Sequence, residues 1–223
     1  KVLGLGVRGV GWREIEIVRL PTGQPTVRLH DRALQRAEQL GTRLAIYVET
    51  QAYQENDNRM PDYIDGEAYG GGRYWLANGA VNPVLWNAAI ADRLANLYRE
   101  LGTVFDGHPR LAAVTTTETS LPLGGGMPPD YVEAYSYDQH EQAVRKAVAG
   151  LRAGFKRTVT IQYVNYPEQI FDGVTAALPG DSVGLGGPDV FLDDASLTEG
   201  IYRYYPALAG TVPIGPSVQW DNY

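Results

Sequence analysis

The sequence predicts an α/β protein with a (β/α)8 TIM-barrel-like fold that is incomplete at one or both ends. Segments with strand patterns alternate with segments with helix patterns, which favours parallel strands joined by right-handed crossovers. Long loops containing Gly and Pro follow the strands, as they do at the C-terminal rim of such folds. The chain has 223 residues, somewhat fewer than the roughly 250 of a complete barrel. A doubly wound open sheet is the alternative.

Six segments read as strands, because each is a short apolar or β-branched run, and most lie between turn residues. A seventh candidate strand covers Val2–Val7. The six are residues 12–18, 43–49, 111–120, 157–165, 181–187 and 211–219.

Five segments read as helices, and the clearest is Pro83–Leu101. Proline stands at its start, leucines and alanines line one side, and Gly102 follows its end. The other predicted helices are residues 30–40, 137–155, 168–178 and 197–209. We treat residues 1–223 as a single barrel domain.

Composition excludes several classes of function. The net charge is −7 and no basic stripe is present, which argues against nucleic acid as a partner. No run approaches the roughly 20 apolar residues of a membrane span. With no cysteine and three histidines far apart in sequence, we expect neither a metal site nor a cofactor.

The two ends of the sequence are abrupt. Lys1 opens the chain without a signal-like segment, and Tyr223 closes it directly after a predicted strand. We therefore expect a processed or truncated chain, which would be part of a larger chain or assembly. A secreted or cell-surface location is favoured.

The N-terminal glycines match a dinucleotide fingerprint. Gly4, Gly6 and Gly9 have the G-x-G-x-x-G spacing. That motif needs a strand before it and a helix after it, and no helix pattern follows here. A chance match in a Gly-rich segment is therefore favoured. A phosphate-bearing cofactor at this segment is kept as a third hypothesis.

Polar side chains follow the predicted strands, where parallel strands would bring them to one shared mouth. Glu118 ends the apolar stretch Leu111–Ser120, and its apolar surroundings would favour the protonated form that a general acid needs. Its partner carboxylate would be Asp221 or Glu49. Candidate sugar-binding residues are Glu16, Trp75, Gln162, Asn165, Tyr166, Asp189, Gln219 and Trp220.

Three stretches resemble the clan-A glycoside hydrolases, the cellulase- and β-galactosidase-like barrels. WREIEIV with LHDRALQRAEQLGTRLAIYVE is similar to their passage from the second strand to the third. WNAAIADRLANLYRELG with FDGHPRLAAVTTTETS is similar to the helix and fourth strand that end in the acid/base Glu, and VPIGPSVQWDNY to the seventh strand. The resemblance implies that Glu118 is the acid/base. Thr117 stands where those enzymes usually have Asn, and Asp221 is the nearest carboxylate to their nucleophile.

The sequence therefore predicts a glycoside hydrolase that acts on oligosaccharide or polysaccharide by carboxylate acid/base catalysis. The alternative is a non-catalytic glycan-binding or structural barrel domain of a larger protein or assembly. A second carboxylate within reach of Glu118 across an open cleft would distinguish the two.

Overall fold

The computed structural model describes residues 5–11, 16–19, 25–28, 32–123, 126–187, 190–191 and 193–217, and their side chains from residue 34 onward. Four candidate site residues lie outside this part of the chain: Asp189, Gln219, Trp220 and Asp221. Glu16 lies in a described strand, but its side chain is not described.

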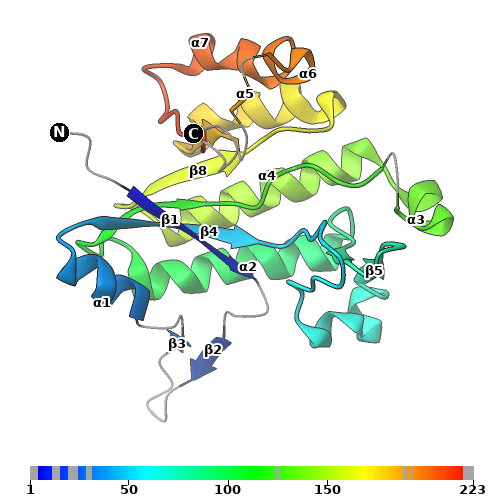
Figure 1. Cartoon of the computed structure of the whole chain (residues 1–223), viewed down its shortest axis with the longest axis horizontal. Coiled ribbons are helices and arrows are strands. Elements are labelled where there is room, and N and C mark those ends of the chain that lie inside the picture. Colours follow the sequence, from blue (N-terminus) through cyan, green and yellow to red (C-terminus); the bar gives the residue numbers. More distant parts are fainter. Residues whose placement is uncertain are drawn as a thin grey trace.

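A five-stranded parallel sheet forms the centre of the molecule (Figure 1). Its strand order follows the chain: β1 (Leu5–Gly11), β4 (Arg43–Glu49), β7 (Leu111–Thr115), β8 (Val159–Tyr163) and β9 (Gly184–Gly186). A doubly wound sheet reverses its order at a switch point, so this sequential order excludes that alternative. It is the order of a (β/α) barrel.

The segment 213–217 extends the sheet beyond β9. The Leu185 amide donates to the Pro213 carbonyl at 2.9 Å, and the Gly215 amide donates to the Leu185 carbonyl at 3.0 Å. Ile214 forms a parallel bridge with Leu185. Within the described residues this segment does not pair with β1, so the barrel is open there. The fold is thus TIM-barrel-like and incomplete, as the sequence predicts.

Four helices of at least two turns accompany the sheet: α1 (Arg32–Gln39), α2 (Ala88–Phe105), α4 (Tyr137–Gly154) and α5 (Phe171–Asp181). Consecutive helices pack against one another, α2 against α4 and α4 against α5, and Figure 1 shows α2 and α4 running behind the strands. The buried apolar core lies between these helices and the sheet, and includes Val48, Val114, Leu97 and Leu151. This is the outer helix layer of a barrel.

The contact between α2 and α4 is close because it is made by small residues. A Cβ added to Gly150 would lie 2.5 Å from the Ala95 carbonyl oxygen, and one added to Gly154 would lie 2.4 Å from the Tyr98 carbonyl oxygen. Real Cβ atoms do not approach that closely. The two helix backbones therefore touch where these glycines lie.

The connecting segments carry the remaining elements. Between β4 and α2 lie the antiparallel pair β5 (Arg73–Trp75) and β6 (Val81–Pro83), with the short 3-10 helices η2 (Asp62–Asp65) and η3 (Glu67–Tyr69). The later segments contain α3 (Pro129–Ala134), η4 (Glu168–Ile170), α6 (Ala195–Thr198), η5 (Ile201–Tyr204) and α7 (Tyr205–Leu208).

One prediction for the N-terminal region is wrong. The described part of the predicted strand 12–18 belongs to β2 (Glu16–Arg19), which pairs antiparallel with β3 (Pro25–Arg28) outside the main sheet. The first strand of the sheet is instead β1, close to the seventh candidate strand. Gly6 and Gly9 lie within β1 in register with β4, so they do not form a phosphate-binding turn before a helix.

Three further boundaries differ from the predictions. Pro83 belongs to β6, and α2 begins at Ala88 because the Asn87 side chain accepts from the amides of Ala89 and Ile90. The predicted helix 197–209 is divided into α6, η5 and α7, with Gly200 immediately before η5 and Pro206 in the first turn of α7. The predicted last strand is represented by the short paired segment 213–217.

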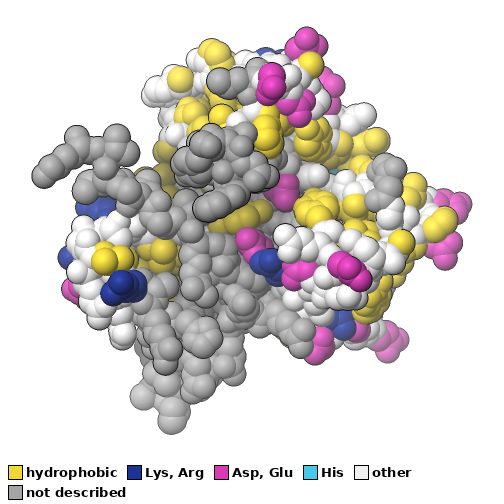
Figure 2. All heavy atoms as spheres, viewed as in Figure 1, with side chains coloured by type: hydrophobic (Ala, Val, Ile, Leu, Met, Phe, Trp, Pro, Cys, Tyr) yellow, Lys and Arg dark blue, Asp and Glu magenta, His cyan; other side chains and the backbone are white. Residues whose placement is uncertain are grey.

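Surface charge is mixed in the described part of the molecule. On the face drawn in Figure 2, its basic side chains are scattered rather than gathered in one patch. Among the helices that the structure describes, none has the length and apolarity to cross a membrane.

Candidate functional site

Glu118 lies on the loop that follows β7, at the C-terminal edge of the sheet. Its side chain is half-buried, and its Oε2 accepts a hydrogen bond of 2.6 Å from Asn165 Nδ2. Asn165 follows the neighbouring strand β8. The structure thus brings together two polar residues that the sequence places after different strands, because parallel neighbours end at the same edge.

Asn165 is held in one orientation by the backbone around it. It is 3% exposed. Its Oδ1 accepts from the backbone amides of Ser120 at 2.9 Å and Tyr166 at 3.0 Å. The backbone amide of Asn165 itself donates to Thr119 Oγ1 at 3.2 Å. Because Oδ1 receives two amides, the side-chain nitrogen must face Glu118.

Tyr47 approaches Glu118 from the strand on the other side of β7. The rings of Tyr47 and Tyr163 lie 5.3 Å apart on the face of the sheet opposite the helices. Burial, and then the negative charge of Glu118, raise the pKa of the Tyr47 phenol well above its usual value. The phenol therefore stays neutral beside the carboxylate.

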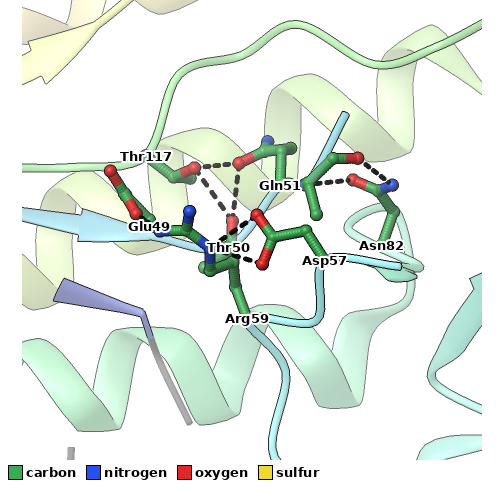
Figure 3. A network of polar contacts seen from close by, with 8 residues as sticks. Glu49, Thr50, Gln51, Asp57, Arg59, Asn82 and Thr117 are labelled. Atoms are coloured by element: carbon green, nitrogen blue, oxygen red, sulfur yellow. Dashed lines mark hydrogen bonds and ion pairs between the residues drawn. The ribbon is translucent and has the colours of Figure 1, made fainter. Parts of the chain in front are cut away.

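A buried network of threonine and glutamine side chains supports the Glu118 loop (Figure 3). The Thr50 hydroxyl is 2.9 Å from Thr117 Oγ1 and 2.7 Å from Gln51 Oε1, and Thr117 also contacts Gln51. Gln51 Nε2 donates to the Glu118 carbonyl at 2.9 Å. These bonds tie the loop after β4 to the loop after β7 and fix the backbone that carries Glu118.

Glu49, the candidate partner carboxylate, is engaged in an ion pair. Its Oε2 contacts the Arg59 guanidinium, whose Nε lies 2.9 and 2.8 Å from the two carboxylate oxygens of Asp57. Figure 3 shows Arg59 between Glu49 and Asp57, beside Thr50. Strand alternation places Glu49 on the same face of β4 as Tyr47.

Two tyrosines lie on either side of the Glu118 loop. The Tyr53 hydroxyl donates to the Ser120 carbonyl at 3.1 Å, and Tyr53 is 43% exposed. On the β8 side, the Tyr166 hydroxyl is 2.9 Å from Ser196 Oγ. Four successive post-strand loops, after β4, β7, β8 and β9, therefore contribute to this edge of the sheet.

The structure also describes two further predicted sugar contacts, Gln162 and Trp75. Gln162 is buried and lines a cavity between the sheet and helices α2 and α4 that Glu118 also lines, and its Nε2 donates to the Tyr163 carbonyl at 2.7 Å. Trp75 is 50% exposed and stacks on the Arg73 guanidinium at 5.2 Å. Alternation along β5 places the Trp75 side chain on the opposite face from Tyr74. Burial, and then the nearby Tyr53, raise the pKa of the Tyr74 phenol.

Sequence analysis missed three residues of the site: Tyr47, Gln51 and Tyr53. The sequence did contain a signal for Tyr47. It lies two residues before Glu49 on the predicted strand 43–49, so the two side chains share one face of the sheet. No group of three or more His, Cys, Asp or Glu among the described residues could hold a metal ion.

No family model matches the chain. Over 41 residues it is 54% identical to the holo-[acyl-carrier-protein] synthase of Gloeobacter violaceus, covering 18% of this chain and 31% of that protein. Over 50 residues it is 46% identical to the synthase of Herpetosiphon aurantiacus, covering 19% and 39%. The chain thus spans about a third of these relatives, and most of it lies outside the matched stretch.

Solved glycoside hydrolases resemble the chain over nearly its whole length. A GH5_18 protein from Streptomyces cattleya, in complex with GlcNAc, matches with a TM-score of 0.50 at 9% identity, covering 96% of this chain and 60% of that one. Endo-glycoceramidase II from Rhodococcus sp. matches with a TM-score of 0.46 at 13% identity, covering 94% and 63%. The first likeness supports the barrel-like fold that the strand order indicates.

Proposed function

We propose that the chain belongs to a glycoside hydrolase that cleaves oligosaccharide or polysaccharide, with Glu118 as a catalytic carboxylate. The observation that carries this proposal is the Glu118–Asn165 pair at the C-terminal edge of an incomplete barrel. Barrel enzymes build their active sites at this edge. The glycoside hydrolases among the structural neighbours agree with the proposal.

The chemistry requires two carboxyl groups. Glu118 would protonate the leaving glycosidic oxygen, and a second carboxylate would attack the sugar carbon or activate water. Glu49 would have to leave Arg59 to do so. Asp221 follows the segment 213–217, which runs beside β9, and is therefore the better candidate. A separation of about 5–5.5 Å would give retention, and about 6.5–9.5 Å inversion.

Sugar recognition would come from the tyrosines that flank Glu118. An aromatic ring offers an apolar face to the C–H face of a pyranose while its hydroxyl keeps a polar partner. The exposed ring of Tyr53 has this character, with its hydroxyl already held by the Ser120 carbonyl. Tyr166 is half-buried on the opposite side. A substrate crossing from Tyr53 to Tyr166 would pass over Glu118.

The proposal is tested by a screen of oligosaccharides and polysaccharides for release of reducing ends. For a glycan that the protein cleaves, proton NMR of the first product identifies its anomer, and hence whether cleavage proceeds with retention or inversion. Asp221→Asn should reduce the rate strongly, whereas Glu49→Gln should act mainly on stability. Equal rates for wild type and Asp221→Asn would reject Asp221 as the second carboxylate.

A non-catalytic glycan-binding domain is the second candidate function. The ion pair of Glu49 with Arg59 favours it, because one of the two candidate partner carboxylates is already engaged. Calorimetric titration with the same glycans separates the two functions. Binding to wild type and to Glu118→Gln without hydrolysis by either would support the binding domain.

A further inference from the structure

We propose that Asn165 is a positioning residue that sets both the orientation and the protonation of Glu118. The inference deepens the proposed function and rests on it for the catalytic role. Its basis is the juxtaposition of one buried amide with one half-buried carboxylate, at 2.6 Å, across two neighbouring loops.

The first step of the argument is that the amide cannot turn round. Asn165 Oδ1 accepts the amides of Ser120 and Tyr166, so a flip would set a nitrogen against two N–H donors. The only orientation that satisfies the side chain presents Nδ2 to Glu118. Asn165 is therefore a fixed donor rather than an adaptable sugar contact.

The second step concerns the bond itself. An N–H donor to a carboxylate forms a short, charge-assisted bond that is stronger than one to a neutral group. Such a donor favours the ionised over the protonated carboxyl group. Asn165 thus opposes the protonation that burial of Glu118 would promote, and it keeps the carboxylate in one place.

The third step identifies the other groups that face Glu118. From β4 it is Tyr47, a neutral phenol, and from β8 they are Asn165 and Gln162, which do not titrate. Helices α2 and α4 add only apolar side chains to the cavity that Glu118 lines. Glu49 lies further along the same face of β4, and Arg59 compensates its charge. Asn165 is therefore a donor in direct contact with the Glu118 carboxylate, and its replacement by a carboxyl group would act directly on the titration of Glu118.

The test replaces one amide group by a carboxyl group. Asn165→Asp keeps an oxygen for the two backbone amides and places a second carboxyl 2.6 Å from Glu118. Two carboxyls at that separation share a proton, so the midpoint of the Glu118 titration should rise by more than about one pH unit. Carbon-detected NMR of glutamate-labelled protein measures the midpoint, with Glu118→Gln assigning the signal.

Asn82→Asp is the matched control. Asn82 is also fully buried, and its side chain bonds the Ala52 amide and carbonyl at 3.0 and 2.8 Å, away from the Glu118 carboxylate. Asn82→Asp makes the same chemical change as Asn165→Asp, and we expect it to lower the free energy of unfolding by a similar amount. The control should leave the Glu118 midpoint within about 0.3 pH unit of wild type.

The outcomes separate this inference from the proposed function. A raised midpoint in Asn165→Asp alone supports the inference, and with an active enzyme the pH–rate profile should move the same way. A raised midpoint in a protein that hydrolyses no glycan supports the coupling and rejects the hydrolase. An unchanged midpoint, or an equal change in Asn82→Asp, overturns the inference whatever the activity.

Discussion

Asp106 joins two loops at the opposite edge of the sheet, and its charge should contribute measurably to stability. Its Oδ1 accepts the amides of Arg157 and Thr158, each at 2.9 Å. Burial alone would raise the pKa of Asp106, but these amide hydrogen bonds outweigh it and lower the pKa to about 2. The change from the ordinary 3.8 to about 2 corresponds to about 2 kcal/mol in favour of the folded state.

The direction of the pH dependence follows from the lowered pKa. The contribution is fully present above about pH 4, and it is lost as the pH falls from about 4 to about 2. Asp106→Asn keeps an oxygen for the amides and removes only the charge. It should therefore cost about 2 kcal/mol at pH 7, and the cost should shrink towards zero as the pH falls to 2.

Urea unfolding of wild type and Asp106→Asn, followed by circular dichroism from pH 7 down to pH 2.5, measures this difference. Arg157→Ala is the control, because the Arg157 side chain is 73% exposed and its ion pair with Asp106 spans 3.4 Å. It should change stability by less than about 1 kcal/mol. A cost of Asp106→Asn that is the same at every pH would refute the electrostatic reasoning.

Four further predictions each concern a single site. Gly150→Ala should destabilise the protein by about 1–3 kcal/mol despite the better helix propensity of alanine, because its Cβ would meet the Ala95 carbonyl at 2.5 Å. Gly180→Ala, with open space around it, should be neutral or stabilising in the same unfolding assay. Burial lowers the pKa of His140 to about 4. The free energy of unfolding should therefore fall by about 3 kcal/mol as the pH is lowered from 6.5 to 4. In His140→Phe this pH-dependent loss of stability should be absent. Tyr53→Ala should raise KM several-fold for oligosaccharides while Tyr53→Phe changes it little; equal effects would show that the hydroxyl, not the ring, matters.

Sequence patterns predicted the parts of the fold in which local signals agree. The strand Arg43–Glu49 has its predicted bounds, since an apolar run stands between a glycine turn and a polar loop. The helix Tyr137–Gly154 is one residue shorter than predicted. The segment 12–18 was wrongly assigned to the main sheet, because alternating side chains suit a hairpin strand as well as a strand of the main sheet. Alternation does not reveal the pairing partner.

The candidate site was predicted in outline but not in its contacts. Strand-end reasoning brought Glu118 and Asn165 to one edge, yet it assigned Asn165 to sugar, because a sequence shows neither burial nor the amides around a side chain. The same reasoning placed Gln162 near Glu118, and the two residues line one cavity between the sheet and helices α2 and α4. The ion pair of Glu49 with Arg59 spans a loop whose conformation no local pattern predicts.

The most direct measurement of the central claim is the rate of glycan hydrolysis by wild type and by Glu118→Gln under identical conditions. The substitution keeps the size of the side chain and removes its acid/base function. The account predicts that wild type releases reducing ends from at least one glycan and that Glu118→Gln is slower by about 10²- to 10⁴-fold. Equal rates in the two proteins would contradict it.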